Sequence, residues 1–319
     1  MSTNNQIPVF FSIDDSYAPY LAVALNSAIK NSSIHRNYRA IILHQSLSKE
    51  NQARLLKLAK DNFSIEFYEM KQGLETITDR SSNYLRCDYF TLTIYYRLFI
   101  AKMFPDLEKG IYIDSDVVVL GDLAELYDIE LGNNFIAACR DRSVSDVPPL
   151  AKYMEECIGV SKDEYINSGV LLMNLKLLRE SRFDEHFLSL LNAYHFESIA
   201  PDQDYINAIC NGRILYLDEV WDAMPNDKQP ELENVRIIHY NLFSKPWCYD
   251  NIQYGDYFWQ YAAESGYLDE AQKNKRCYSQ EQKDNDSNCL VILIANGEKF
   301  CDNEVTFKKM YDRGIKIRL

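Results

Sequence analysis

The chain has 319 residues, 47% of them hydrophobic, which suits one large domain with an extension or two domains. A formal net charge of −13, without a block of Lys or Arg, argues against nucleic acid as the main partner. The sequence predicts no signal peptide and no membrane-spanning run, and its eight scattered cysteines form no Cys-x-x-Cys pair. We therefore expect a cytoplasmic protein with reduced thiols and no structural zinc.

The first seventy residues alternate between apolar strands and amphipathic helices. We predict strands at 8–13, 38–44 and 64–68, and helices at 18–30 and after Ser48, which caps the helix carrying Leu55, Leu56 and Leu58. This order is typical of a parallel sheet with crossover helices. Asp14 and Asp15 stand where a Gly-rich turn would follow the first strand, which disfavours a dinucleotide cofactor.

The next segments lead to a pair of acids. A helix is predicted at 92–103, and Arg97 within its apolar face needs a carboxylate partner or a ligand, because an unpaired buried charge is costly. A buried strand at 111–113 then runs into Asp114-Ser115-Asp116. Residues two apart on an extended chain point to the same side, so Asp114 and Asp116 can converge while Ser115 faces away.

Two carboxylates that share one point at neutral pH need a counter-charge or a shared proton. A divalent cation such as Mg²⁺ or Mn²⁺ supplies the charge and prefers hard oxygen ligands. An Asp-x-Asp pair also occurs in helix caps and solvated turns. The carboxyl end of a sheet strand, however, is where open α/β sheets bind their ligands.

Helices and strands continue to alternate up to about residue 265. We predict strands at 134–139, 165–174 (interrupted at Asn167-Ser-Gly169), 213–217 and 234–240, and helices at 122–127, 151–157, up to Asn192 and from Pro201. Residues 272–288 are polar and predict a linker or hairpin, and 289–295 predict one more strand. We therefore expect a main domain at 1–265 and an add-on segment at 266–319. The basic end of that segment either docks on an anionic membrane surface or a large acceptor, or is a solvated packing extension.

Six motifs between residues 8 and 247 occur in the order found in one enzyme family. They are Phe10-Phe-Ser-Ile-Asp-Asp-Ser-Tyr17, Tyr96-Arg-Leu98, Tyr112-Ile-Asp-Ser-Asp116, Asn167-Ser-Gly169, Pro201-Asp-Gln-Asp204 and His239-Tyr-Asn-Leu-Phe-Ser-Lys-Pro-Trp247. In this combination the chain resembles family 8 of the retaining glycosyltransferases, which includes lipopolysaccharide galactosyltransferases and glycogenin. The resemblance implies an α/β GT-A fold, with a mostly parallel Rossmann-like sheet flanked by helices, a UDP-sugar donor and Mn²⁺.

The resemblance also assigns a metal and phosphate site. Asp114 and Asp116 match the family's metal-binding pair, and His239 matches its third ligand, which suits a cation that accepts imidazole along with oxygens. Lys245 matches a phosphate-contacting lysine. Taken alone, His239 is also consistent with a core histidine bonded to backbone, and Lys245 with a solvated surface lysine.

The remaining assignments concern the nucleoside and the sugar. Ser12, Ile13, Asp14 and Tyr17 resemble the uridine site, and Ser115 a ribose contact; the alternative is a helix cap at Asp14 or Asp15 with Tyr17 packed at the rim. Residues that match positions around the donor sugar are Arg97, Asn167, Ser168, Asp202 and Gln203, with Asp141 near donor sugar and acceptor. The expected catalytic residues are Gln203, Asp202 and Asp141.

Gln203 stands where a nucleophile would be needed for double displacement, yet an amide is a poor nucleophile. The resemblance therefore implies a front-face reaction, in which Gln203 stabilises positive charge at the anomeric carbon and the acceptor attacks from the side that UDP leaves. Two positions depart from the family pattern. Ser168 replaces a common Ala, and Leu242 replaces the Gly three residues after the metal-binding His, which puts a backbone contact to phosphate in doubt.

Four functions remain open. The first is a bacterial transferase that moves galactose, or else glucose, from UDP to a saccharide or glycoprotein acceptor for the cell surface, in the cytoplasm or at the inner membrane face. The second is a glycogenin-like primer that glycosylates itself, which 23 tyrosines keep open. The third is a non-catalytic module that binds sugar nucleotides or glycans. A two-metal phosphodiesterase is the remote fourth, because it needs more His and Asp than this region offers.

Overall fold

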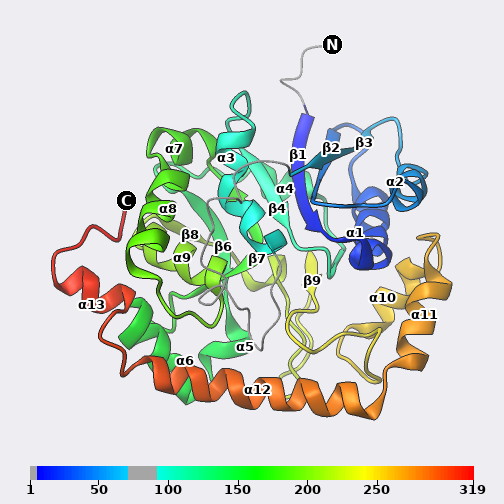
Figure 1. Ribbon diagram of the computed structural model, residues 1–319. Coiled ribbons are helices and arrows are strands. Elements are labelled where there is room, and N and C mark those ends of the chain that lie inside the picture. The colour runs from blue at the N-terminus through cyan, green and yellow to red at the C-terminus, as the bar shows by residue number, and fades with distance from the viewer. Residues whose placement is uncertain (1–5, 71–91) are drawn as a thin grey trace.

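A seven-stranded sheet runs through the centre of the computed structural model, which describes residues 6–70 and 92–319 (Figure 1). Its order is β3-β2-β1-β4-β7-β6-β8. The strands are β1 Gln6–Ile13, β2 Asn37–His44, β3 Phe63–Glu69, β4 Gly110–Ile113, β6 Ile136–Arg140, β7 Ile166–Met173 and β8 Ile214–Tyr216. β7 pairs antiparallel with β4 and β6, whereas the other pairings in this sheet are parallel. The predicted α/β class with a mostly parallel sheet is therefore confirmed.

Helices flank this sheet, and β5 Val117–Val119 pairs with β9 Ile237–His239 in a separate small sheet. The helices are α1 Ala18–Asn31, α2 Lys49–Leu56, α3 Ile100–Met103, α4 Leu123–Tyr127, α5 Arg142–Ser145, α6 Pro148–Tyr153, α7 Leu175–Glu180, α8 Phe183–Tyr194, α9 Pro201–Cys210, α10 Gly255–Ala262, α11 Leu268–Cys277, α12 Gln280–Phe300 and α13 Phe307–Asp312. Ser48 caps α2 by accepting from the Asn51 N–H, as predicted. Among the described residues, no helix has both the length and the apolar composition needed to cross a bilayer.

The core is divided by the sheet because strand side chains alternate between its two faces. On β1, Val9 and Phe11 belong to the cluster that contains Leu21 and Leu25 of α1. Phe10 points to the other face, into the cluster built on α8 and α9. The described cysteines are free thiols, and all except Cys277 are buried.

The segment 92–103 is helical as expected, but it begins as a 3₁₀ helix, Leu92–Phe99, before α3. Two other local expectations in the first 200 residues were wrong. β7 is not interrupted at Asn167-Ser-Gly169. The shift in the register between β6 and β7 lies on β6, between Ala138 and Arg140. The helix expected up to Asn192 is two helices, since Arg182 adopts a φ of +54° between α7 and α8.

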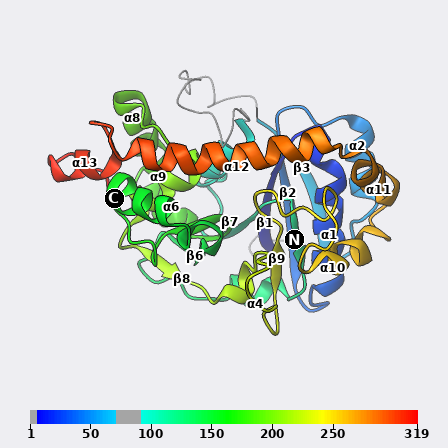
Figure 2. The same cartoon turned by 90° about the horizontal axis from the view of Figure 1, so that it is seen from below.

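The C-terminal segment differs most from expectation, because its predicted hairpin and strand are both helical. Ser279 and Gln282 form a reciprocal capping box that starts α12. Cys289, Leu293 and Gly297 then recur every fourth residue as one buried stripe, which is the period of a helix and not of a strand. Figures 1 and 2 show α12 crossing the molecule from α11 to α6. The division into 1–265 and 266–319 stays a prediction.

Candidate active site

The small sheet brings an imidazole to the pair of acids. Asp114 and Asp116 lie in the bend that joins β4 to β5, and not on an extended strand as expected. β5 pairs antiparallel with β9 so that Val117 lies opposite His239. The Tyr240 N–H donates to the Asp116 carbonyl at 2.9 Å. This register fixes His239 beside the two carboxylates, although the segments are far apart in the sequence.

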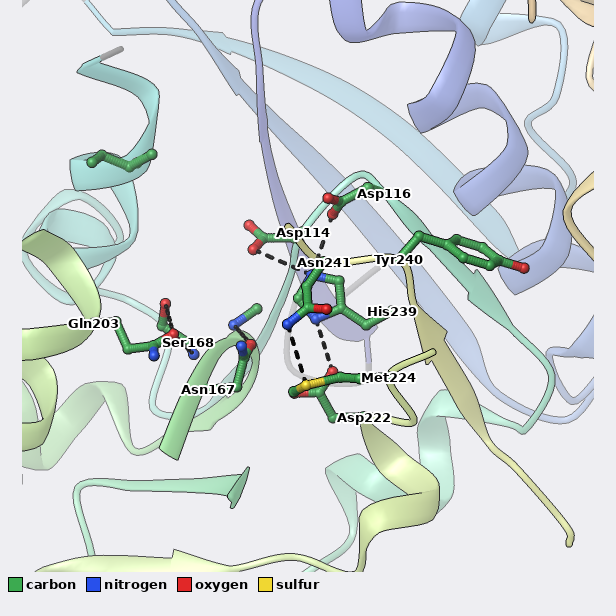
Figure 3. Close-up of polar contacts among 12 residues, drawn as sticks. Asp114, Asp116, Asn167, Ser168, Gln203, Asp222, Met224, His239, Tyr240 and Asn241 are labelled. Atoms are coloured by element: carbon green, nitrogen blue, oxygen red, sulfur yellow. Dashed lines mark hydrogen bonds and ion pairs between the residues drawn. The ribbon is translucent and has the colours of Figure 1, made fainter. Parts of the chain in front are cut away.

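The three side chains form a compact donor set (Figure 3). One ligand atom from each of Asp114, Asp116 and His239 lies within 4.8 Å of the others. His239 Nε2 is 3.4 Å from Asp116 Oδ1 and 3.9 Å from Asp114 Oδ2. Two carboxylate oxygens and one imidazole nitrogen fit a cation such as Mn²⁺ or Mg²⁺. The alternative of a core His bonded to backbone does not apply to His239, because both ring nitrogens face carboxylates.

Asp222 orients this imidazole, and the sequence analysis did not find it. Its Oδ1 lies 2.9 Å from His239 Nδ1, so Nε2 is the nitrogen that faces the acids. Burial alone would lower the pKa of His239, but Asp222 and Asp116 raise that pKa to about 10. Only the fold reveals this pair, because nothing in the local sequence around Asp222 marks it as a partner of His239.

Lys245 is bonded inside the protein and is not a solvated surface lysine. Its ammonium donates to Asp116 Oδ2 and to the Tyr240 carbonyl, and its side chain is 12% exposed. Burial alone would raise the pKa of Asp116, but Lys245 and His239 hold that pKa well below its usual range. Asp116 therefore stays ionised, as a metal ligand must.

Arg97 joins the acids to the α9 side of the site. Its guanidinium lies 2.8 Å from Asp114 Oδ1 and 3.2 Å from Asp202 Oδ2, and the side chain is 5% exposed. It also donates to the carbonyl and hydroxyl oxygens of Ser168, at 2.6 and 3.0 Å. The buried charge thus has the carboxylate partners that the sequence analysis required of it.

The Gln203 amide is held at both ends. Its Oε1 accepts from the Ser168 N–H at 3.0 Å, and its Nε2 donates to Asp141 Oδ2 at 2.9 Å. Asn167 donates to the same Asp141 oxygen at 3.0 Å. Asp141 Oδ2 accepts from both amides, so the end of Gln203 that faces Asp141 is the one that carries the nitrogen. Asp141 is fully buried, so it contacts the Gln203 amide from within the protein.

Gly169 allows His239 to lie against β7. A Cβ atom at this position would be only 2.2 Å from His239 Cε1. The glycine of the Asn167-Ser-Gly169 motif is thus explained by close approach of the imidazole. At the first loop, Asp14 accepts from the Ser16 and Tyr17 N–H groups at 2.9 and 3.2 Å, so the helix-cap interpretation of Asp14 is correct.

A cavity of about 510 Å³ collects these groups. Of the predicted site residues, all but Asp141 and Lys245 line it, including Ser115, which was expected to face away from the acids. Lining residues that the sequence analysis missed include Tyr112, Asn241 and Phe243, together with Asn285, Asp286 and Cys289 of α12. The last three lie in the segment where the secondary structure was predicted wrongly.

Leu242 also lines the cavity and adopts a φ of +52°, a conformation that favours glycine. The backbone thus keeps a glycine-like shape at the position where the resembled family commonly has Gly. We expect Leu242→Gly to be more stable than Leu242→Ala by about 1 kcal/mol, because both lose the side chain but only Ala is strained. Urea unfolding of the two variants measures the difference.

Ser244 provides the control for this comparison, because its φ is not positive. There the usual order, with Ala more stable than Gly, should return. The same order at both positions would show that the backbone at Leu242 carries no strain.

Comparisons with known proteins agree with this geometry. A model of glycosyl transferase family 8 matches residues 8–251. A Haemophilus influenzae protein named as a glycosyltransferase is 33% identical over 69% of this chain and 64% of its own length. The lipopolysaccharide 1,2-glucosyltransferase of Escherichia coli K12 is 26% identical over 80% of this chain and 78% of its own length.

Two solved structures share the fold. The galactosyltransferase LgtC, crystallised with donor and acceptor sugar analogues, has a TM-score of 0.68 and 25% identity over 81% of this chain and 96% of its own. The bifunctional glycosyltransferase WbbM has a TM-score of 0.73 and 26% identity over 86% of this chain. This chain spans only 53% of the WbbM chain, and about two thirds of the Haemophilus relative. On the match over residues 8–251, the protein belongs to glycosyl transferase family 8, with a GT-A fold.

Proposed function

We propose that the protein is a retaining transferase that moves a hexose, galactose rather than glucose, from a UDP-sugar to a saccharide or glycoprotein acceptor. It would act in the cytoplasm on a bacterial surface glycan before export, with Mn²⁺ as its preferred metal. The observation that carries the proposal is the convergence of Asp114, Asp116 and His239 in one cavity with the Gln203 amide. The names of the E. coli relative and of LgtC support a hexose donor and a saccharide acceptor.

Each part of the cavity has one task in this proposal. A divalent cation held by Asp114, Asp116 and His239 would neutralise the diphosphate as UDP departs. The residues at the end of β1 and the start of α1 would hold the nucleoside: Ser12, Ile13, Asp14 and Tyr17. Arg97, which already pairs with two carboxylates, would hold Asp202 in place to accept hydroxyls of the donor sugar.

The sugar would react on one face. The bond between the anomeric carbon and the phosphate oxygen breaks, and the acceptor oxygen bonds to that carbon from the same side. The acceptor proton passes to the departing phosphate oxygen. Gln203 Oε1 accepts from the Ser168 N–H at 3.0 Å and lies 3.4 Å from the Ser168 hydroxyl, which is nearer to Asp202 Oδ2, at 3.0 Å. With that hydroxyl donating to Asp202, the second lone pair of Oε1 would stabilise the positive charge that develops at the anomeric carbon.

We expect Gln203→Ala to lower kcat by about 10²–10³-fold, the usual cost of losing one group that stabilises transition-state charge. Donor affinity should change far less, because the phosphates and nucleoside are held elsewhere in the cavity. Single-turnover rates and calorimetry with UDP-hexose measure the two effects. Ser168→Ala, which keeps the backbone N–H that holds Gln203, is the milder comparison variant. Equal losses of kcat and donor affinity would show that Gln203 does not stabilise the transition state.

A donor screen tests the proposed activity directly. Purified protein is incubated with UDP-galactose, UDP-glucose, UDP-N-acetylglucosamine and GDP-mannose, with and without Mn²⁺, and released nucleotide is measured. We expect metal-dependent release from a UDP-hexose. The absence of release from every UDP-sugar, with Mn²⁺ or Mg²⁺ present, would refute the activity. Intact mass after incubation without acceptor decides the self-glycosylating alternative, since only a primer gains hexose units.

A further inference from the structure

We propose that the amino-terminal half of α12 is one wall of the acceptor site and binds saccharide hydroxyls through Asn285 and Asp286. The inference rests on the proposed function, because it assigns the acceptor side of the same cavity. It concerns residues that lie beyond the stretch matched by the family model, which ends at residue 251. The acceptor preference would thus be set by a segment outside the part of the chain that the family model matches.

The first observation is the course of α12. Figures 1 and 2 show this helix crossing from the α11 side of the molecule to the α6 side. In its second half Leu293 and Gly297 are buried, and a Cβ at Gly297 would lie 2.8 Å from Leu150 of α6. One helical turn before Leu293, Cys289 belongs to the same stripe and lines the cavity with Asn285 and Asp286. The face that packs on α6 therefore continues as a wall of the cavity.

The second observation is that this wall is anchored. Asp286 Oδ2 accepts from the hydroxyls of Tyr249 and Tyr278, each at 2.7 Å. Tyr278 follows α11 directly, and Tyr249 lies shortly after β9, so one carboxylate oxygen joins three segments. Burial raises the pKa of both phenols, and the bond to Asp286 raises it further, so both stay donors. The helix is thereby fixed at the cavity as well as on α6.

The third observation is that Asp286 and Asn285 keep hydrogen-bonding atoms that a ligand could use. Among residues 6–70 and 92–319, the hydrogen-bond partners of Asp286 are the two phenols, and both use Oδ2, which leaves Oδ1 as an acceptor. Asn285 is exposed, and its Nδ2 donates to Cys289 Sγ at 3.8 Å, which leaves its second N–H as a donor and its Oδ1 as an acceptor. A carboxylate next to an amide suits neighbouring hydroxyl groups of a sugar. It does not suit a diphosphate, because like charges repel, so this wall fits a neutral saccharide acceptor better than the nucleotide donor.

The test uses two variants and a matched control, all made in the 319-residue chain. Asn285→Trp places a bulky side chain in the cavity beside α12. Asp286→Asn keeps an oxygen that accepts from the two phenols and replaces the other carboxylate oxygen with an N–H donor. The control is Asn288→Trp, at an exposed Asn of the same helix that does not line the cavity. The probes are lactose and maltose, whose binding is followed by saturation-transfer NMR in the presence of UDP and Mn²⁺. UDP binding is measured separately by calorimetry.

We expect at least one disaccharide to bind the unmodified protein. Asn285→Trp and Asp286→Asn should weaken that binding about tenfold or more relative to any change in UDP binding. The first substitution occupies the space of the disaccharide, and the second removes hydrogen bonds to a charged group. Asn288→Trp should change neither affinity. Unchanged disaccharide binding, an equal loss of UDP binding, or no disaccharide binding at all would each overturn the proposal. Failure of the proposed function is seen separately, as the absence of nucleotide release from every UDP-sugar.

Discussion

Replacing Asp116 with Asn should lower the rate of sugar transfer by more than about a hundredfold. Loss of a residue that only supports a metal ligand costs up to about a hundredfold, and loss of a direct ligand should cost more. The substitution keeps the size of the side chain and removes its charge. His239 Nε2 lies 3.4 Å from Asp116 Oδ1, and Lys245 bonds Oδ2, so the lost charge is the one on which the ammonium, the imidazole and a metal ion would converge. Affinity for Mn²⁺ should fall with the rate, and added Mn²⁺ should restore part of the activity.

Mn²⁺ titration followed by electron paramagnetic resonance, together with initial rates, measures these effects. Asp128→Asn is the matched control, since Asp128 is also an acid but is exposed and pairs with Arg36 away from the cavity. It should leave Mn²⁺ affinity and rate unchanged. Retention of both properties in Asp116→Asn would exclude the metal site, and with it the proposed route for UDP departure.

Replacing Arg97 with Met should destabilise the fold by about 3–5 kcal/mol, the usual cost of removing one partner from a buried ion pair. Met replaces the unbranched stem of Arg97 but not its guanidinium, so Asp202, at 5% exposure, loses its cation. Asp114 and the carbonyl of Ser168 lose a donor as well. The midpoint of guanidinium unfolding should therefore fall while the slope stays constant.

The exposed pair of Arg36 and Asp128 provides the comparison. Its two hydrogen bonds, at 2.7 and 2.9 Å, are as short as those of Arg97, but both side chains are more than a third exposed. Arg36→Met should therefore cost less than about 1 kcal/mol. If both substitutions cost the same, burial would not be what makes Arg97 important.

Local patterns in the sequence were sufficient to predict much of the fold. The alternation of 8–13, 38–44 and 64–68 with two amphipathic helices identified β1, β2 and β3 and their parallel order. Ser48 was identified as a cap because its hydroxyl and the first free N–H groups of α2 lie within three residues. The order of the motifs also identified the family, which the match of the family model over residues 8–251 confirms. All of these features depend on neighbours in the chain, so they can be read from the sequence.

The sequence analysis failed where a local pattern had two solutions. The apolar run at 289–295 is compatible with a strand, and the polar stretch before it with a linker. α12 forms because Cys289, Leu293 and Gly297 meet α6 and the cavity at helical spacing, a surface that the sequence does not display. Leu290, Val291 and Ile292 consequently remain exposed.

By itself, the sequence determined which residues have the chemistry for the site, namely two acids after a buried strand, an imidazole, a buried arginine and an amide. The tertiary structure decided which of them meet. The β5–β9 register brings His239 to Asp116, Asp222 fixes the orientation of the imidazole, and α12 lines one side of the cavity. The physical reason is that periodicity and capping act over a few residues, whereas strand register and helix packing are chosen by the burial of surfaces distant in the chain.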